Sequence, residues 1–176
     1  MPLSLHAAFV PTALQIVGAT RALVDKAEEW CAAGSHDPDG LLDCRLIEDM
    51  LPFNYQVKSV ALHTAGAVEA VKVGEFQPDF TDPPATFEGL RERLDGATAT
   101  LEAITEAELE AVIGKDMVFT VPGRPTRFEF TADDFLLTFS QPNYFFHAAT
   151  AYDLLRMKGI DIGKRDWLLG MRGKMA

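Results

Sequence analysis

The stretch TADDFLLTFSQPNYFFHAATAYDLLRMK, residues 131–158, decides the fold class. It opens with Thr131 three residues before Asp134, the spacing of a helix N-cap and its capping partner. Apolar residues then recur every three or four positions, as on the buried face of a helix: Phe135, Leu136, Phe139, Phe146, Ala149, Leu154 and Leu155. We predict a helix from Ala132 to about Lys158, kinked at Pro142 because proline has no backbone N–H.

Three more stretches show the same helical period, over residues 4–33, 41–73 and 87–105. Pro11 lies inside the first of them. Pro52 lies near the middle of the second, where it should kink or split the helix. A short extra turn of helix is predicted after the third.

One segment has a different period. Residues 117–121 and 127–131 alternate between apolar and polar, and the turn residues between them predict a β-hairpin. Four long helices with one hairpin predict a mainly α protein, an antiparallel four-helix bundle with the hairpin between helices three and four. We expect one domain over residues 1–176, in which residues 160–176 form a docked C-terminal tail.

Length and charge limit the class of protein. The chain has 176 residues, the length of one domain. Its 16 Lys and Arg against 26 Asp and Glu give a net charge of −10, the wrong sign for binding phosphate backbones or anionic lipid. We therefore expect neither nucleic acid nor a membrane as partner. No signal peptide is predicted, so a cytoplasmic location follows as the default. Cys31 and Cys44 lack metal or redox spacing and are expected to be free thiols.

Two histidines are the candidate site residues. His63 and His147 fall inside the predicted second and fourth helices, and an imidazole on the inner face of a bundle needs a hydrogen-bond partner or a metal. Asn143 lies four residues before His147 and shares its helix face. Gln56 lies seven residues before His63, in a polar stripe that starts at Asp49.

Distance along the helices limits which residues can join that site. At a rise of 1.5 Å per residue, Asp49 lies about 21 Å from His63 and cannot share a metal with it, so we expect it to pair with Arg45 or to cap the kink at Pro52. If the first two helices form a hairpin, His6 lies roughly 6 Å beyond the residue opposite His63. His6 is therefore a candidate third imidazole.

Several stretches together carry a family likeness, namely residues 4–11, 45–52, 56–63, 142–156 and 159–166, above all PNYFFHAATAYDLLR at 142–156. The pattern resembles the DinB/YfiT-like superfamily of four-helix bundles, and within it a branch that is a domain of unknown function. The likeness covers nearly the whole chain, so it implies the same fold.

The resemblance also implies a metal site. Metal-binding members of the superfamily use three histidines, one on the second helix and two in an HxxxH pair on the fourth. His63 matches the first and His147 the last, while Asn143 stands in place of the other. The resemblance implies a divalent metal, Zn or Ni, on His63 and His147 with Asn143 in the third place, and the helix register offers His6 as the alternative third ligand. It also implies thiol-dependent transferase, isomerase or hydrolase chemistry. With an amide in place of an imidazole, the metal is held weakly, or the site is metal-free and its polar neighbours orient His147.

Two functions follow from these residues. In the first, a pocket between the second and fourth helices binds a small molecule through Gln56, Asn143 and Tyr144, with His147 as the catalytic base or a metal ligand. In the second, the protein is a non-catalytic homodimer in which His63, Asn143 and His147 are hydrogen-bond partners in the core and the apolar tail forms the interface. No Asp or Glu lies within reach of the two histidines by spacing, which predicts a neutral site.

Overall fold

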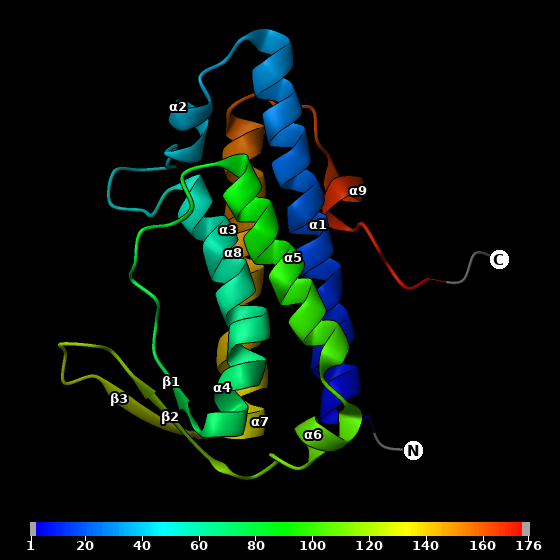
Figure 1. Ribbon diagram of the computed structural model, residues 1–176, viewed down its shortest axis with the longest axis vertical. Coiled ribbons are helices and arrows are strands. Elements are labelled where there is room, and N and C mark those ends of the chain that lie inside the picture. The colour runs from blue at the N-terminus through cyan, green and yellow to red at the C-terminus, as the bar shows by residue number, and fades with distance from the viewer. Residues whose placement is uncertain (1–2, 174–176) are drawn as a thin grey trace.

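The computed structural model describes residues 3–173 and is mainly helical with one small sheet, as predicted. The long helical segments lie side by side, and the sheet lies at one end of them (Figure 1). These segments are α1 (Leu5–Gly34), α3 (Phe53–Ala61) with η1 (Leu62–Gly66) and α4 (Ala67–Val73), α5 (Phe87–Ala103), and α7 (Ala132–Asp134) with η2 (Phe135–Ser140) and α8 (Gln141–Met157). The short elements are α2 (Pro38–Leu42), α6 (Glu106–Glu110), α9 (Lys164–Trp167), β1 (Glu75–Phe76), β2 (Asp116–Thr120) and β3 (Arg127–Thr131).

Helix α1 is a core helix. Ser4 caps its first turn by accepting a hydrogen bond from the N–H of Ala7, and Pro11 is accommodated within the helix. By length and composition α1 is apolar enough to cross a membrane, and it is the one such helix among residues 3–173. Half of its apolar 18-residue window is buried inside the protein, as in the core helix of a soluble domain.

The predicted second helix is wrong over residues 43–52, which are not helical. Helix α2 ends at Leu42, and α3 begins only at Phe53, with Pro52 as an extended N-cap residue. Proline lacks the N–H that a continuous helix would need, so of the two predicted alternatives Pro52 splits the segment and does not kink it. Asp49 is exposed in the irregular segment between them and lies on no helical stripe. Arg45 donates a hydrogen bond to the carbonyl of Met50 (2.7 Å), and it forms no ion pair with Asp49 in the described chain.

The predicted fourth helix is confirmed from Ala132 to Met157, with Thr131 as its N-cap. Pro142 is accommodated just after η2, a π-helical segment in which the turns are wider than in an α-helix. A second π-helical segment, η1, interrupts the helix from Phe53 to Val73. Such segments are rare and occur frequently at functional sites.

The predicted hairpin is confirmed as β2 and β3, with Met117 opposite Phe130. The sequence did not predict β1, which pairs in parallel with β2 and completes a sheet of order β1-β2-β3. Gly74 ends α4 in the left-handed conformation (φ 88°) and turns the chain directly into β1. A strand of two residues shows no alternation from which it could be predicted.

A buried lysine fixes the connector between β1 and α5. Lys58 on α3 is 1% exposed. Its ammonium donates to the carbonyls of Asp79 (3.0 Å) and Thr81 (2.7 Å) and lies 3.0 Å from the Asp79 carboxylate. Burial acts to raise the pKa of Asp79, but hydrogen bonds from Thr81 and Lys58 outweigh it and lower this pKa to about 2. The connector is thus held to α3 by a charge that has no access to water.

The C-terminal segment contacts the long helices through α9. Asp166 accepts a hydrogen bond from Lys26 of α1 (2.6 Å), and the ring of Trp167 lies 6.4 Å from that of Tyr152 of α8. The last part of the predicted tail, residues 174–176, lies outside the described residues. Cys31 and Cys44 are buried free thiols, as predicted.

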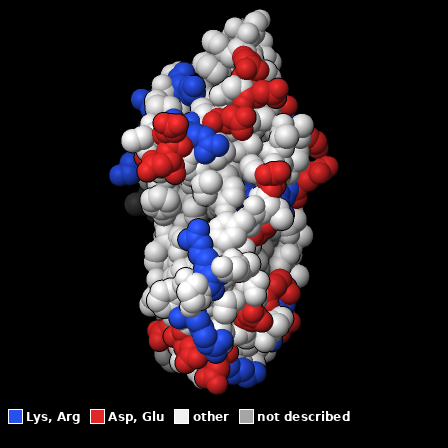
Figure 2. All heavy atoms as spheres, turned by 90° about the vertical axis from the view of Figure 1, so that its left-hand side faces the viewer, with Lys and Arg blue, Asp and Glu red and all other residues white. Residues whose placement is uncertain are grey.

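Charges are mixed over the surface. The face drawn in Figure 2 carries acidic and basic side chains in mixed groups, separated by areas without charge. The net charge of −10 is therefore carried by surface groups, and the buried polar residues include only one charged side chain, Lys58, among those described.

Candidate functional site

The structure brings His63 and His147 together. Their ring centroids lie 5.6 Å apart and the ring planes are tilted by only 15°. His63 lies on η1 and His147 on α8, two segments that run in opposite directions. His63 is 7% exposed, whereas His147 is partly exposed. The pair predicted from helical spacing is therefore a real pair, with His147 on its outer side.

Gln56 determines which nitrogen of His147 carries the proton. The side-chain amide of Gln56 donates to the carbonyl of Leu51 (2.8 Å), which can only accept. The amide oxygen of Gln56 therefore faces Nδ1 of His147, 2.7 Å away, so Nδ1 must be the donor. In neutral imidazole the other nitrogen then has a free lone pair, so Nε2 of His147 is an acceptor.

Both imidazoles are neutral at pH 7. Burial, and to a smaller extent the neighbouring His147, lowers the pKa of His63 to about 3. Burial also lowers the pKa of His147, to about 4. No carboxylate contributes to either shift, in agreement with the neutral site predicted from the sequence.

His63 has an unsatisfied nitrogen. Its Nδ1 is fully buried and has no hydrogen-bond partner in the described residues. A buried polar group without a partner costs about 1–3 kcal/mol, so such a group in a native protein calls for an explanation. A bound molecule or an ordered water would satisfy this nitrogen.

Aromatic rings surround the histidines, and the sequence did not assign them to the site. The centroids of Phe76 and Phe139 lie 5.4 and 5.6 Å from that of His63. Phe146, which is 56% exposed, lies edge-on to His147 at 5.4 Å. Phe76 comes from the unpredicted strand β1 and Phe139 from the π segment η2. Helical spacing alone therefore could not place either ring beside His63.

The other predicted site residues have different surroundings. The amide of Asn143 donates to the carbonyl of Phe139 one turn earlier (2.7 Å). Tyr144 is fully buried and packs edge-on against Phe9 of α1 (5.8 Å), away from the surface. His6 lies within hydrogen-bond distance of the carbonyl of Ile104, 3.2 Å from its Nε2.

The donor set does not fit the zinc or nickel site that the resemblance implies. Catalytic zinc sites use three protein ligands, and an amide oxygen is a much poorer ligand than imidazole. Within residues 3–173 no three His, Cys, Asp or Glu side chains are grouped so as to hold a metal ion. His63 and His147 therefore supply two strong ligands where three are needed.

The pocket predicted between the second and fourth helices is not among five cavities of the described residues. These cavities, from about 180 to about 470 Å³, are lined by other side chains, and neither histidine lines any of them. Access to the pair is therefore through the partly exposed edge of His147, next to Phe146.

Replacing Tyr144 by Phe should raise the free energy of unfolding by about 1 kcal/mol, because the buried hydroxyl of Tyr144 has no hydrogen-bond partner in the described residues. Burial raises the pKa of this hydroxyl above its ordinary value and outweighs the lowering by the nearby Gln141 side chain, which does not meet the geometry of a hydrogen bond, so the hydroxyl stays protonated. Urea denaturation of the two proteins measures the difference. A loss of 1 kcal/mol or more would mean that the hydroxyl has a partner, such as a buried water.

Comparisons with known proteins agree with this architecture. The chain is similar to a protein in a crystal structure described as a DinB family member from Shewanella denitrificans, with 27% sequence identity and a TM-score of 0.80. The similarity covers 98% of this chain and 96% of the other. The comparison with curated proteins gives no match. The family likeness inferred from the sequence is confirmed, since the pattern of a known family matches residues 5–168. The chain belongs to the family described as Domain of unknown function (DUF1993), with a DinB-like fold.

Proposed function

We propose that the protein binds a small uncharged molecule at the His63–His147 pair, without a metal ion. The observation that carries the proposal is the hydrogen bond from His147 to Gln56, which leaves Nε2 of His147 as a fixed acceptor. A ligand with an O–H or N–H group can donate to this nitrogen. The long helices, interpreted as the antiparallel four-helix bundle expected from the sequence, hold both rings in place.

The surroundings indicate the kind of ligand. Neither imidazole is charged at pH 7, and no carboxylate contributes to the pKa shift of either ring, so nothing at the pair attracts an ion. Phe139 and Phe146 offer aromatic surface beside the histidines. A flat, uncharged molecule with one hydrogen-bond donor matches both features.

Binding is favoured over proton abstraction. A general base works best when its pKa lies near the working pH. The pKa of His147, about 4, makes this imidazole a weak base at pH 7. We therefore propose His147 as the residue that positions the ligand.

Phenol and anisole provide the test, since they differ in the O–H donor. Phenol titrated into the ¹⁵N-labelled protein should shift the amide signals around residues 56–63 and 143–147. Anisole should bind at least about threefold more weakly, because it cannot donate the hydrogen bond to His147. His147→Ala should abolish the difference. His36→Ala, at an exposed histidine elsewhere, is the matched control and should preserve it.

Equal binding of phenol and anisole, or full binding of phenol by the His147→Ala variant, would contradict the proposal. Metal analysis of protein purified without chelator gives a separate answer. About one equivalent of zinc or nickel that disappears in the His147→Ala variant would replace the proposal by a metal site.

A structural role is the second candidate, favoured by the same short bond between Gln56 and His147 across two packed helices. The homodimer expected from the sequence belongs to this candidate, with exposed Leu168 and Leu169 next to Trp167 as its contact surface. In this case no probe binds, and His147→Ala lowers only the melting temperature. Sedimentation equilibrium of the wild-type protein tests the dimer directly.

A further inference from the structure

One of the five cavities lies at the end of α1 and is not lined by His63 or His147. It has a volume of about 460 Å³, within the range of small-molecule sites, and is enclosed by the end of α1, by α2 and by the start of α5. Cys31, Leu42 and Phe87 line it and are each at most 5% exposed, so they form an apolar floor.

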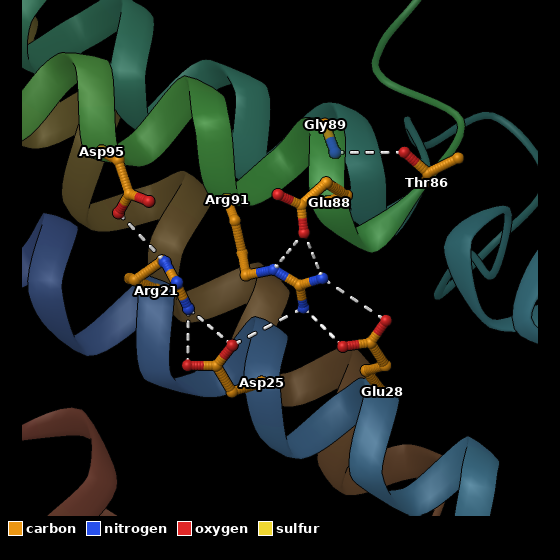
Figure 3. Close-up of polar contacts among 8 residues, drawn as sticks. All are labelled: Arg21, Asp25, Glu28, Thr86, Glu88, Gly89, Arg91 and Asp95. Atoms are coloured by element: carbon orange, nitrogen blue, oxygen red, sulfur yellow. Dashed lines mark hydrogen bonds and ion pairs between the residues drawn. The ribbon is translucent and has the colours of Figure 1, made fainter.

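Carboxylates form the rim of this cavity. Glu28, Asp39 and Glu88 line it, and no Lys or Arg does so. Arg91 binds two of them, Glu28 at 2.5 Å and Glu88 at 2.6 Å, as Figure 3 shows. Asp39 forms no ion pair with another described residue, so the rim keeps a net negative charge. Lys158 lines a separate smaller cavity together with His36.

The end of α1 adds to this negative potential. The carbonyls at the C-terminal end of a helix carry partial negative charge, and a basic residue in the last turn commonly offsets it. Helix α1 has 30 residues and no basic residue in its last turn. The N-terminal end of α5, which carries partial positive charge, also reaches the cavity. This end is compensated, because Thr86 accepts a hydrogen bond from the N–H of Gly89 and the acidic Glu88 lies in the first turn (Figure 3). The negative end of α1 therefore has backbone caps at the carbonyl of Cys31 but no basic residue in its last turn to offset it.

His36 forms part of one wall, whereas its stacking partner Trp30 is not among the lining residues. His36 lies flat on Trp30, with ring centroids 3.7 Å apart and a tilt of 14°. Gly34 makes room for this arrangement, since a Cβ at this position would lie 2.3 Å from Nε2 of His36. Phe87 supplies a further aromatic ring in the floor. Aromatic rings attract organic cations through their electron-rich faces.

We propose that this cavity binds an organic cation, with an ammonium group at the carboxylate rim and an apolar body of about the size of a benzene ring on the floor. Asp39 offers a carboxylate that no described cation occupies, and Cys31, Leu42 and Phe87 offer the apolar contact. The charge distinguishes this site from the uncharged histidine pair.

Three probes with the same body test the proposal: the phenethylammonium ion, 2-phenylethanol and 3-phenylpropionate. Titration into the ¹⁵N-labelled protein at low salt should shift amide signals of residues 28–42 and 85–88. The ammonium should bind about tenfold more tightly than the alcohol, and the carboxylate should bind most weakly, since charge and aromatic contacts favour a cation. Added NaCl should weaken the binding of the ammonium alone.

Variants at the rim locate the binding. Ala32 is exposed and lines the cavity, whereas its exposed neighbour Ala33 does not, so Ala32→Trp should block binding and the matched Ala33→Trp should leave it unchanged. Asp39→Asn should reduce the preference for the ammonium over the alcohol without filling the cavity. The proposal is overturned if the alcohol binds as tightly as the ammonium, if no probe shifts these signals, or if both tryptophan variants bind alike.

Discussion

Replacing Lys58 by Met should lower the free energy of unfolding by about 3 kcal/mol, the largest effect that we expect from a single polar substitution. The ammonium of Lys58 is 1% exposed and is bonded to two carbonyls, a hydroxyl and a carboxylate of the connector. Methionine keeps the apolar stem but leaves these four acceptors without their donor. Urea denaturation followed by circular dichroism measures the loss.

Lys72→Met is the matched control for this prediction. Lys72 also pairs with a carboxylate, that of Glu69, but both groups reach solvent. Exposed pairs contribute about 0–1 kcal/mol, so the control should change stability by no more than that. Equal effects of the two substitutions would show that the connector is not held by the buried charge.

The stability of the protein should fall by about 3 kcal/mol between pH 6.5 and pH 5, with the two buried histidines as the cause. The pKa values of His63 and His147 in the folded protein are about 3 and about 4, below the ordinary value of 6.5. Between pH 6.5 and pH 4 the unfolded chain therefore binds up to two more protons than the folded one. Their contribution to stability is present above pH 6.5 and is lost as the pH falls through about 4 for His147 and about 3 for His63.

Denaturant titrations at half-unit steps of pH measure this slope. His63→Leu or His147→Leu should each reduce it by about 1.4 kcal/mol per pH unit, the value for one proton. His36→Gln, at an exposed position, should leave the slope unchanged. Asp79, with a pKa of about 2, contributes only below pH 4 and does not disturb this window. A flat profile between pH 5 and 6.5 would mean that neither imidazole is buried in its neutral form.

The sequence predicts those parts of the fold that depend on one buried face. Residues such as Phe9 and Leu154 recur at helical spacing because they face the core, and both are fully buried. The hairpin is predictable because its strands alternate and its turn contains two prolines and a glycine. The same spacing rule places His63 and His147 on inner faces that meet.

Other features depend on contacts that spacing cannot predict. The start of α3 at Phe53 follows from Pro52, which permits either a kink or a new start, and only packing decides between them. Strand β1 forms by pairing with β2. In this pairing Glu75 lies beside Val118, which is 43 residues further along the chain. From the sequence alone Lys58 would be expected at the surface. It is buried by the connector, which contains Thr81 and is distant in sequence. The role of Gln56 as the partner of His147 likewise depends on a contact between two helices.

The sheet also joins the two helices that carry the histidines. Gly74 alone separates α4 from β1, and Thr131, the last residue of β3, is the N-cap of α7. The helix of His63 and the helix of His147 are therefore connected through β1, β2 and β3 as well as through their own packing. A displacement of the hairpin would therefore act on both of the helices that carry the histidines.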